Sequence, residues 1–216
     1  MMIRRFSVEG GEVVLLGTVQ GLVAEADRVR EAFLATAPSA VALGLSPEAV
    51  GALLRHQPDA NGQDPFEDLP DAEYAYSQRL ARYGEVALPP PDLVEAVRLA
   101  REGSVGAFGV DLSEEQYEDV FTHEVGAFAL LRYGRVQRTL ARKPPEAPDA
   151  RAFSLAWDAR VRRIGALARV EGAREESIAR GARAVAKQAG GRVLLVVDAP
   201  REQGVAARFV ASGSSS

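Results

Sequence analysis

Two sets of polar residues in this sequence have side-chain types that could do chemistry. The first offers hydroxyl, amide and guanidinium groups, which can bind a carboxylate or a phosphate because a guanidinium donates paired hydrogen bonds to such anions. It comprises Thr18, Gln20, Arg174 and Arg201. The second set is acidic, and its carboxylate oxygens could hold Mg²⁺ or Mn²⁺. It comprises Asp111, Glu175 and Asp198.

Each set also has an ordinary structural interpretation. Arg174 could form an ion pair with Glu171 or with Asp198. Asp198 could instead cap a turn or pair with Arg201, and Asp111 could begin a helix. The guanidinium of Arg201 would also repel a cation at the acidic set. The residue types leave the binding and the structural interpretations open.

The elements that must position these residues can be predicted from hydrophobic periodicity. Apolar runs predict strands near residues 12–16, 41–45, 105–110 and 192–197. A further strand over residues 3–8 would join the first of these as a hairpin through Gly10 and Gly11. The last run consists almost entirely of Val and Leu, which is typical of a strand buried on both faces of a parallel sheet.

Helical patterns alternate with these strands. Apolar spacing indicates helices at about 22–33, 73–83, 93–100, 125–140, 153–168 and 173–189. Ser46 and Ser113 are placed to cap two helix starts, Ser113 within a capping box with Gln116. Ligands bind beyond the carboxyl ends of the strands in such folds, so residues 17–21, 43–45, 109–111 and 197–201 are expected to face one cleft.

The predicted fold class is therefore α/β, a three-layer domain with a central, mostly parallel sheet and a helical C-terminal flank or cap. We expect a single domain over residues 1–210 with a helical insertion at about 113–168. Residues 57–71 are rich in Pro, Asp, Asn, Gly and Gln, which indicates a surface loop, and residues 211–216 are predicted as a flexible tail.

Composition excludes several kinds of site. The chain has no cysteine, which excludes thiolate catalysis, iron–sulfur clusters and disulfides and favours a cytoplasmic location. The longest apolar run has only the length of a strand, so no membrane span is expected. His56 and His123 have no second histidine at ligand spacing, and a surface or helix-end position is predicted for each.

Charge is unevenly distributed along the chain. The net charge is −12 over residues 1–121 and +8 over residues 122–216, which favours attraction between the two halves within one fold or across a dimer. One helical face carries a basic stripe, formed by Arg132, Arg135, Arg138 and Arg142. A solvated face or a dimer contact is the preferred interpretation, because no aromatic stacking residues accompany the stripe. Trp157 is predicted to anchor the core.

Several segments resemble the TraB/PrgY family, which is related to the GumN and Tiki proteins. The sequences "VVLLGTVQGLVAEADRVREAF" and "APSAVALGLSPEAVGAL" are similar to that family's opening strand, Gly-Thr-x-His turn and helix, and second strand. The sequence "VEGAREESIARGARAVAKQAGGRVLLVVDAPREQGV" is similar to its closing part, and "GVDLSEEQYEDVF" stands where its middle motif is expected. The resemblance implies a TraB-like α/β fold.

Three departures from the family pattern alter what the resemblance implies. The chain has Gln20 in place of the first histidine, Gly44 in place of the strand-end glutamate and Arg201 in place of the later histidine. In the Tiki proteins these positions are associated with metal-dependent hydrolysis. A neutral amide, a glycine and a cation are poor replacements for imidazole and carboxylate ligands. We therefore expect a degenerate metal site.

The resulting functional expectation is a TraB-like protein that has lost metal-dependent hydrolase activity and needs no cofactor. It would bind a small anionic or peptide ligand or a protein partner. Two other functions stay open. One is a metal-assisted hydrolase that uses Mg²⁺ or Mn²⁺ on oxygen ligands, and the other is a nucleic-acid-contacting accessory protein that uses the basic stripe. Nucleic acid is not the expected partner, and a homo-oligomer is a further alternative.

Overall fold

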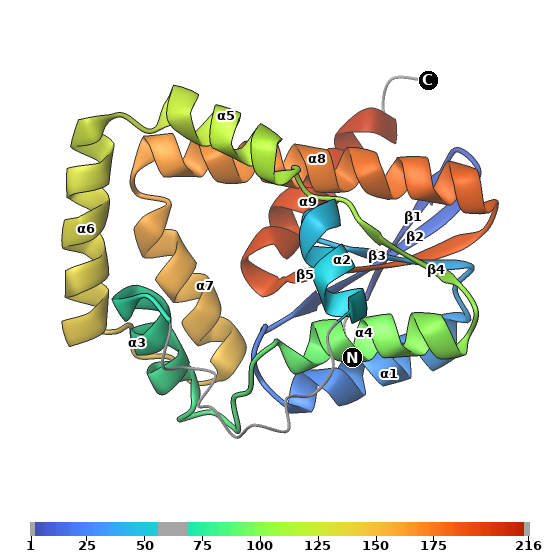
Figure 1. Ribbon diagram of the computed structural model, residues 1–216, viewed down its shortest axis with the longest axis horizontal. Helices are drawn as coiled ribbons and strands as arrows, with labels where there is room; N and C mark the ends of the chain where they lie inside the picture. The colour runs from blue at the N-terminus through green and yellow to red at the C-terminus, as the bar shows by residue number, and fades with distance from the viewer. Residues whose placement is uncertain (1–2, 56–68, 214–216) are drawn as a thin grey trace.

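The computed structural model describes residues 3–55 and 69–213. The described strands form one five-stranded sheet with helices on both faces (Figure 1). Their order across the sheet is β1 (Arg4–Val8), β2 (Gly11–Thr18), β5 (Arg192–Asp198), β3 (Ala40–Leu43) and β4 (Gly106–Gly109). β1 is antiparallel to β2, and all other neighbouring strands are parallel. The predicted α/β class with a mostly parallel sheet is confirmed.

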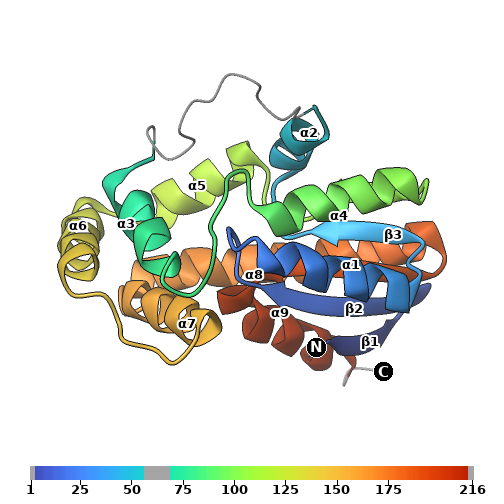
Figure 2. The ribbon, with the colours of Figure 1, turned by 90° about the horizontal axis from the view of Figure 1, so that it is seen from below.

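Four helices complete the three layers. They are α1 (Ala24–Thr36) and α4 (Pro91–Glu102) on one face of the sheet, and α8 (Gly165–Ala189) and α9 (Ala199–Gly213) on the other (Figure 2). Successive side chains of a strand point to opposite faces, so β2 contributes to both layers. Val13 and Leu15 pack with residues of α8 and α9, whereas Val14 and Leu16 pack with residues of α1 and α4.

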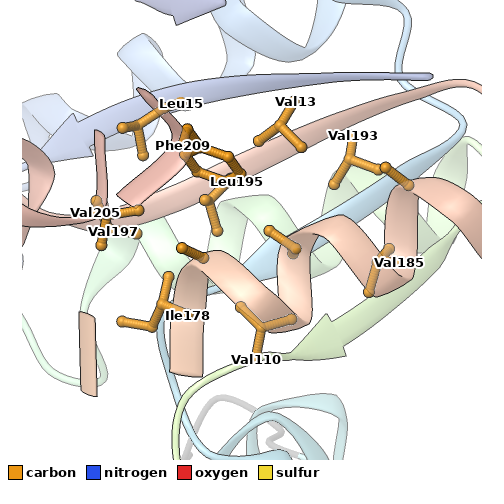
Figure 3. Packing of buried hydrophobic residues seen from close by; sticks show 14 of the residues in the cluster. Val13, Leu15, Val110, Ile178, Val185, Val193, Leu195, Val197, Val205 and Phe209 are labelled. Carbon is orange, nitrogen blue, oxygen red and sulfur yellow. The ribbon is translucent and has the colours of Figure 1, made fainter. Parts of the chain in front are cut away.

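The layer beneath α8 and α9 is formed by aliphatic side chains and one aromatic ring (Figure 3). Ile178 of α8 and Phe209 of α9 lie against Val13, Leu15 and Leu195. Burying one such side chain contributes about 1.5–3 kcal/mol relative to leaving it in water. The continuous apolar runs of β2 and β5 therefore bury side chains against helices on both faces of the sheet.

The remaining helices lie along or beside this core. They are α2 (Pro47–Arg55), α3 (Asp71–Leu80), α5 (Glu114–Glu124), α6 (Ala127–Arg142) and α7 (Ala150–Val161). Helices α3, α6 and α7 lie together at one side of the sheet (Figures 1 and 2).

The predicted capping box of Ser113 and Gln116 begins α5. Trp157 of α7 packs against Tyr76 and Phe153, as expected of a core anchor. None of the described helices is both long and apolar enough to cross a membrane.

The break between α7 and α8 lies earlier than the sequence predicted. We expected helices at 153–168 and 173–189, but α8 begins at Gly165 and runs unbroken through Gly172. Ile164, Leu167 and Val170 are buried in one cluster at the start of α8. Their burial outweighs the cost of Gly172 inside a helix, which is about 1 kcal/mol relative to alanine.

The helix α9 was not predicted. A turn was expected after residue 198 and a tail from residue 211, whereas residues 199–213 are helical. Val205, Ala206 and Phe209 are buried against the sheet at helical spacing, a signal that the sequence already contained. Residues 214–216 and most of the predicted loop at 57–71 lie outside the described residues.

Candidate functional site

The candidate site lies where β2 and β5 end side by side. Thr18, the last residue of β2, pairs in register with Asp198, the last residue of β5. The Thr18 hydroxyl donates to Oδ2 of Asp92 at 2.7 Å and lies 3.3 Å from the carbonyl oxygen of Val197. Asp92 stands in the first turn of α4, so three elements meet at this hydroxyl.

Asp92 is the central residue that sequence reasoning missed. It is 0% exposed, and its Oδ1 has no hydrogen-bond partner among the described residues. Burial raises the pKa of Asp92 to about 6; the hydrogen bond from Thr18 opposes this shift, and the charge of Asp198 adds to it. An acidic residue in the first turn of a helix is common, so its sequence position gave no signal of a site.

Asp198 has a similar environment. Its Oδ1 is buried and lacks a hydrogen-bond partner within the described part of the chain. Burial raises the pKa of Asp198 to about 6, although the nearby cation of Arg201 lowers it. Two carboxyl groups with free oxygen atoms and raised pKa values therefore lie near each other at the end of the sheet.

Gln20, two residues after Thr18, offers an unpaired hydrogen-bond donor. Its Nε2 is buried and donates to none of the described residues. Gln20 also lines two cavities of about 330 Å³ each. The first has aromatic and polar walls that include Glu73, Tyr76, Ser77, Tyr133, Gln137 and Trp157. The second is apolar and is lined by Leu45, Ala49, Ala52, Leu53, Pro89, Pro90 and Leu93. Gln20 thus stands where a polar cavity and an apolar cavity meet.

Arg174 and Arg201 belong to an ion-pair network around Glu171. Glu171 binds both guanidinium groups, at 3.2 Å from Arg174 and 2.8 Å from Arg201. Burial alone would raise the pKa of Glu171, but the charges of Arg201 and Arg174 lower it to about 2. The pairing of Arg174 with Glu171 is one of the structural alternatives that the sequence indicated. Arg201 pairs with Glu171, while its charge also acts on Asp198.

The four predicted ligand-binding residues are thus divided between two places. Thr18 and Gln20 follow β2 at the cavities, whereas Arg174 and Arg201 meet at Glu171. A carboxylate or phosphate would have to compete with Glu171 for both cations. The structure therefore joins the two arginines, but it joins them around an acid that already neutralises part of their charge.

The predicted acidic set is held apart by arginines. Arg174 binds Asp111 at 2.6 Å, and Arg162 binds Glu175 at 2.6 Å, while Asp198 keeps a free oxygen atom. Over residues 3–55 and 69–213, no group of three His, Cys, Asp or Glu side chains is arranged to hold a metal ion. Asp111, Glu175 and Asp198 therefore do not fit Mg²⁺ or Mn²⁺ in this arrangement.

The three positions that depart from the family pattern follow neighbouring strands. Gln20 follows β2 and Gly44 follows β3, while Arg201 stands in the first turn of α9 after β5. The Gly44 amide donates to the carbonyl oxygen of Val196 at 2.9 Å, and a Cβ at this position would lie 3.2 Å from Cγ1 of Val197. A side chain at position 44 would thus be crowded.

His56 lies outside the described residues, and His123 is exposed in the last turn of α5, as predicted.

No family model matches the chain, and no curated protein matches its sequence. The fold and the site define an α/β protein in which buried polar atoms of Gln20, Asp92 and Asp198 have no hydrogen-bond partner among the described residues. The function must therefore be argued from those atoms and from the residues around them.

Proposed function

We propose that this chain is a divergent TraB-like protein that binds a peptide at the carboxyl edge of its sheet and does not hydrolyse it. One observation carries the proposal. Gln20 Nε2, Asp92 Oδ1 and Asp198 Oδ1 are buried polar atoms without a hydrogen-bond partner among the described residues. Leaving such an atom unpaired costs about 1–3 kcal/mol, which a bound ligand would offset.

A peptide supplies the complementary groups. Each backbone unit carries an N–H donor and a carbonyl acceptor. The Gln20 amide, in the wall of both cavities, can donate to a peptide carbonyl. The carboxyl oxygens of Asp92 and Asp198 do not line these cavities, but they are acceptors for a peptide N–H or a terminal ammonium group that reaches them. The mixture of one donor with two acceptors favours this ligand over a simple anion, which would offer acceptors alone and would approach two carboxylates.

The cavities beside Gln20 suit side chains of such a peptide. The polar cavity has Tyr76 and Trp157 in its wall, with ring centroids 5.3 Å apart in an edge-to-face arrangement. Aromatic walls bind apolar or cationic side chains. Glu73 in the same wall would favour a basic side chain. Each cavity of about 330 Å³ falls within the range of small-ligand sites.

Binding without hydrolysis is supported by the residues at the family's metal positions. The resemblance places Gln20, Gly44 and Arg201 there, and the guanidinium of Arg201 would repel a metal ion. Glu171 holds that guanidinium at 2.8 Å. The alternative of a hydrolase with rebuilt oxygen ligands has less support, because Asp111 and Glu175 are both bound to arginines.

A peptide-capture experiment tests the proposal. The purified chain would be incubated with a pooled library of short synthetic peptides, and retained peptides would be identified by mass spectrometry and measured by calorimetry. We expect Gln20→Ala to weaken binding of the retained peptides roughly tenfold, because a buried hydrogen bond is lost. Gln188→Ala is the matched control, since Gln188 is exposed near the end of α8.

Two results would contradict the proposal. If no peptide were retained by the wild-type chain, the unpartnered atoms would not form a peptide site. If retained peptides were cleaved during incubation with added Mn²⁺, the protein would be a hydrolase and not a binding protein.

A further inference from the structure

Four arginine side chains surround a separate cavity between α6 and the end of α7. The cavity has a volume of about 420 Å³. Its lining consists of Arg132, Arg135, Val136, Thr139, Leu140, Arg160 and Arg163. Arg132 and Arg135 come from α6, Arg160 from the last turn of α7 and Arg163 from the link to α8. Only the first two belong to the basic stripe that the sequence predicted.

The four arginines that line this cavity have no ion pair with an acidic residue among the described residues. Within the described part of the chain, Arg132, Arg135 and Arg163 form no ion pair, and Arg160 donates to the carbonyl oxygen of Lys143 at 2.8 Å. The nearby Arg162 shows the contrast, because it binds Asp158, Glu171 and Glu175. Helix α6 itself contains no Asp or Glu. The cavity therefore concentrates positive charge that the described residues do not neutralise.

Such an arrangement concentrates like charges, which a bound anion would neutralise. Like charges at close range repel one another, and the repulsion is reduced only by solvent and salt. The lining combines the four arginines with two aliphatic side chains, of which Leu140 is buried and Val136 is partly buried. Cationic and apolar lining groups together suit a ligand that has an anionic group and a less polar body.

We infer that this cavity binds the phosphate groups of a ligand that carries at least two negative charges. Guanidinium groups bind phosphate with paired, charge-assisted hydrogen bonds, and several converging arginines favour a multiply charged phosphate over a single carboxylate. The cavity volume is that of a small-ligand site. This site is separate from the one proposed at Gln20, and neither proposal depends on the other.

The phosphate could belong to a soluble molecule or to a lipid headgroup. On α6, Phe128 and Leu131 are 79% and 65% exposed, and they lie one or two turns from Arg135 on the same helix. Exposed apolar side chains beside cations would suit the surface of an anionic membrane. The two sources share the same recognition chemistry and are separated by experiment.

The test measures binding of two probes at low ionic strength. Inorganic pyrophosphate, added to the full chain in a calorimeter, represents the soluble source. Phosphatidylcholine vesicles with and without a phosphoinositide bisphosphate, followed by co-sedimentation, represent the lipid source. We expect at least one probe to bind, and Arg135→Gln and Arg163→Gln each to weaken it roughly tenfold, because each removes a charge-assisted hydrogen bond.

Arg138→Gln is the matched control. Arg138 is an exposed arginine of the same helix that does not line the cavity, so its replacement changes the net charge equally. We expect an effect of less than about twofold. Arg135 and Arg163 are also exposed, and circular dichroism would verify that all three variants fold.

Pyrophosphate binding identifies a soluble ligand, and binding to phosphoinositide vesicles alone identifies a headgroup. Failure of both probes, or equal weakening by Arg138→Gln, would overturn the inference.

Discussion

The hydroxyl of Thr18 and the carboxyl group of Asp92 are joined by a buried hydrogen bond of 2.7 Å, although 74 positions separate the residues in the chain. This bond connects the end of β2 to the first turn of α4. It leaves the second oxygen of Asp92 free at the candidate site. One hydroxyl thus both fixes a helix to the sheet and orients a carboxyl group.

Replacing Thr18 with valine should destabilise the fold. The substitution keeps the shape of the side chain but removes the donor to Asp92, so a buried carboxyl oxygen loses its partner. We expect the free energy of unfolding to fall by about 1–3 kcal/mol in urea denaturation at neutral pH. Thr139→Val is the control, because the exposed Thr139 hydroxyl donates only to a carbonyl of its own helix. Equal effects of the two substitutions would contradict this role of Thr18.

The buried carboxyl groups should make stability depend on pH in a defined direction. Burial raises the pKa of Asp92 from an ordinary value of 3.8 to about 6. The folded state therefore binds the proton more tightly than the unfolded state. This contribution to stability is fully present below pH 3.8 and is lost as the pH rises through about 6. A similar contribution comes from Asp198.

Asp92→Asn isolates this effect, because asparagine stays neutral at every pH in the window. We expect the variant to gain stability relative to wild type as the pH rises from about 4 to 7, by up to about 3 kcal/mol. Free energies of unfolding measured in urea at a series of pH values provide the comparison. A difference between the two proteins that stays constant with pH would contradict the raised pKa of Asp92.

Glu171 should be the most sensitive member of the ion-pair network. Glu171→Gln leaves the largely buried guanidinium groups of Arg174 and Arg201 without the carboxylate that they share. We expect a loss of about 3 kcal/mol in the free energy of unfolding, because an uncompensated charge stays buried. Glu176→Gln removes the exposed pair with Arg208 and should cost less than about 1 kcal/mol. Thermal or urea unfolding of both variants would decide, and similar losses would contradict a special role for Glu171.

Two glycines of α8 should respond oppositely to alanine. A Cβ on Gly181 would lie 2.8 Å from Cβ of Val110, so the helix could not keep its distance from the chain after β4. We expect Gly181→Ala to destabilise by about 1–3 kcal/mol. A Cβ on Gly172 would meet only the end of Arg208, at 3.7 Å. Gly172→Ala should therefore stabilise by about 0.5–1 kcal/mol through helix propensity. The same sign for both variants in urea denaturation would refute this account.

Local patterns in the sequence were sufficient for most of the elements. The Val and Leu run at 192–197, the capping box at Ser113 and the end of a helix at residue 189 each depend on neighbouring residues, and each stands in the structure as predicted. The predicted α/β class followed from the alternation of these elements. The boundary between α7 and α8 was wrong because burial of Ile164 outweighed local propensity, whereas α9 was missed although its buried residues, Phe209 among them, have helical spacing in the sequence.

The amino-acid sequence by itself determined the strands, most of the helices and the residues that follow each strand. Only the tertiary structure decided which of those residues meet. Asp92 joins Thr18, and Glu171 binds both Arg174 and Arg201. The physical reason is that a side-chain hydrogen bond or ion pair acts over a few ångströms, whereas its partners are separated by up to 74 positions along the chain. Their contact depends on strand order and helix packing, which no local spacing records.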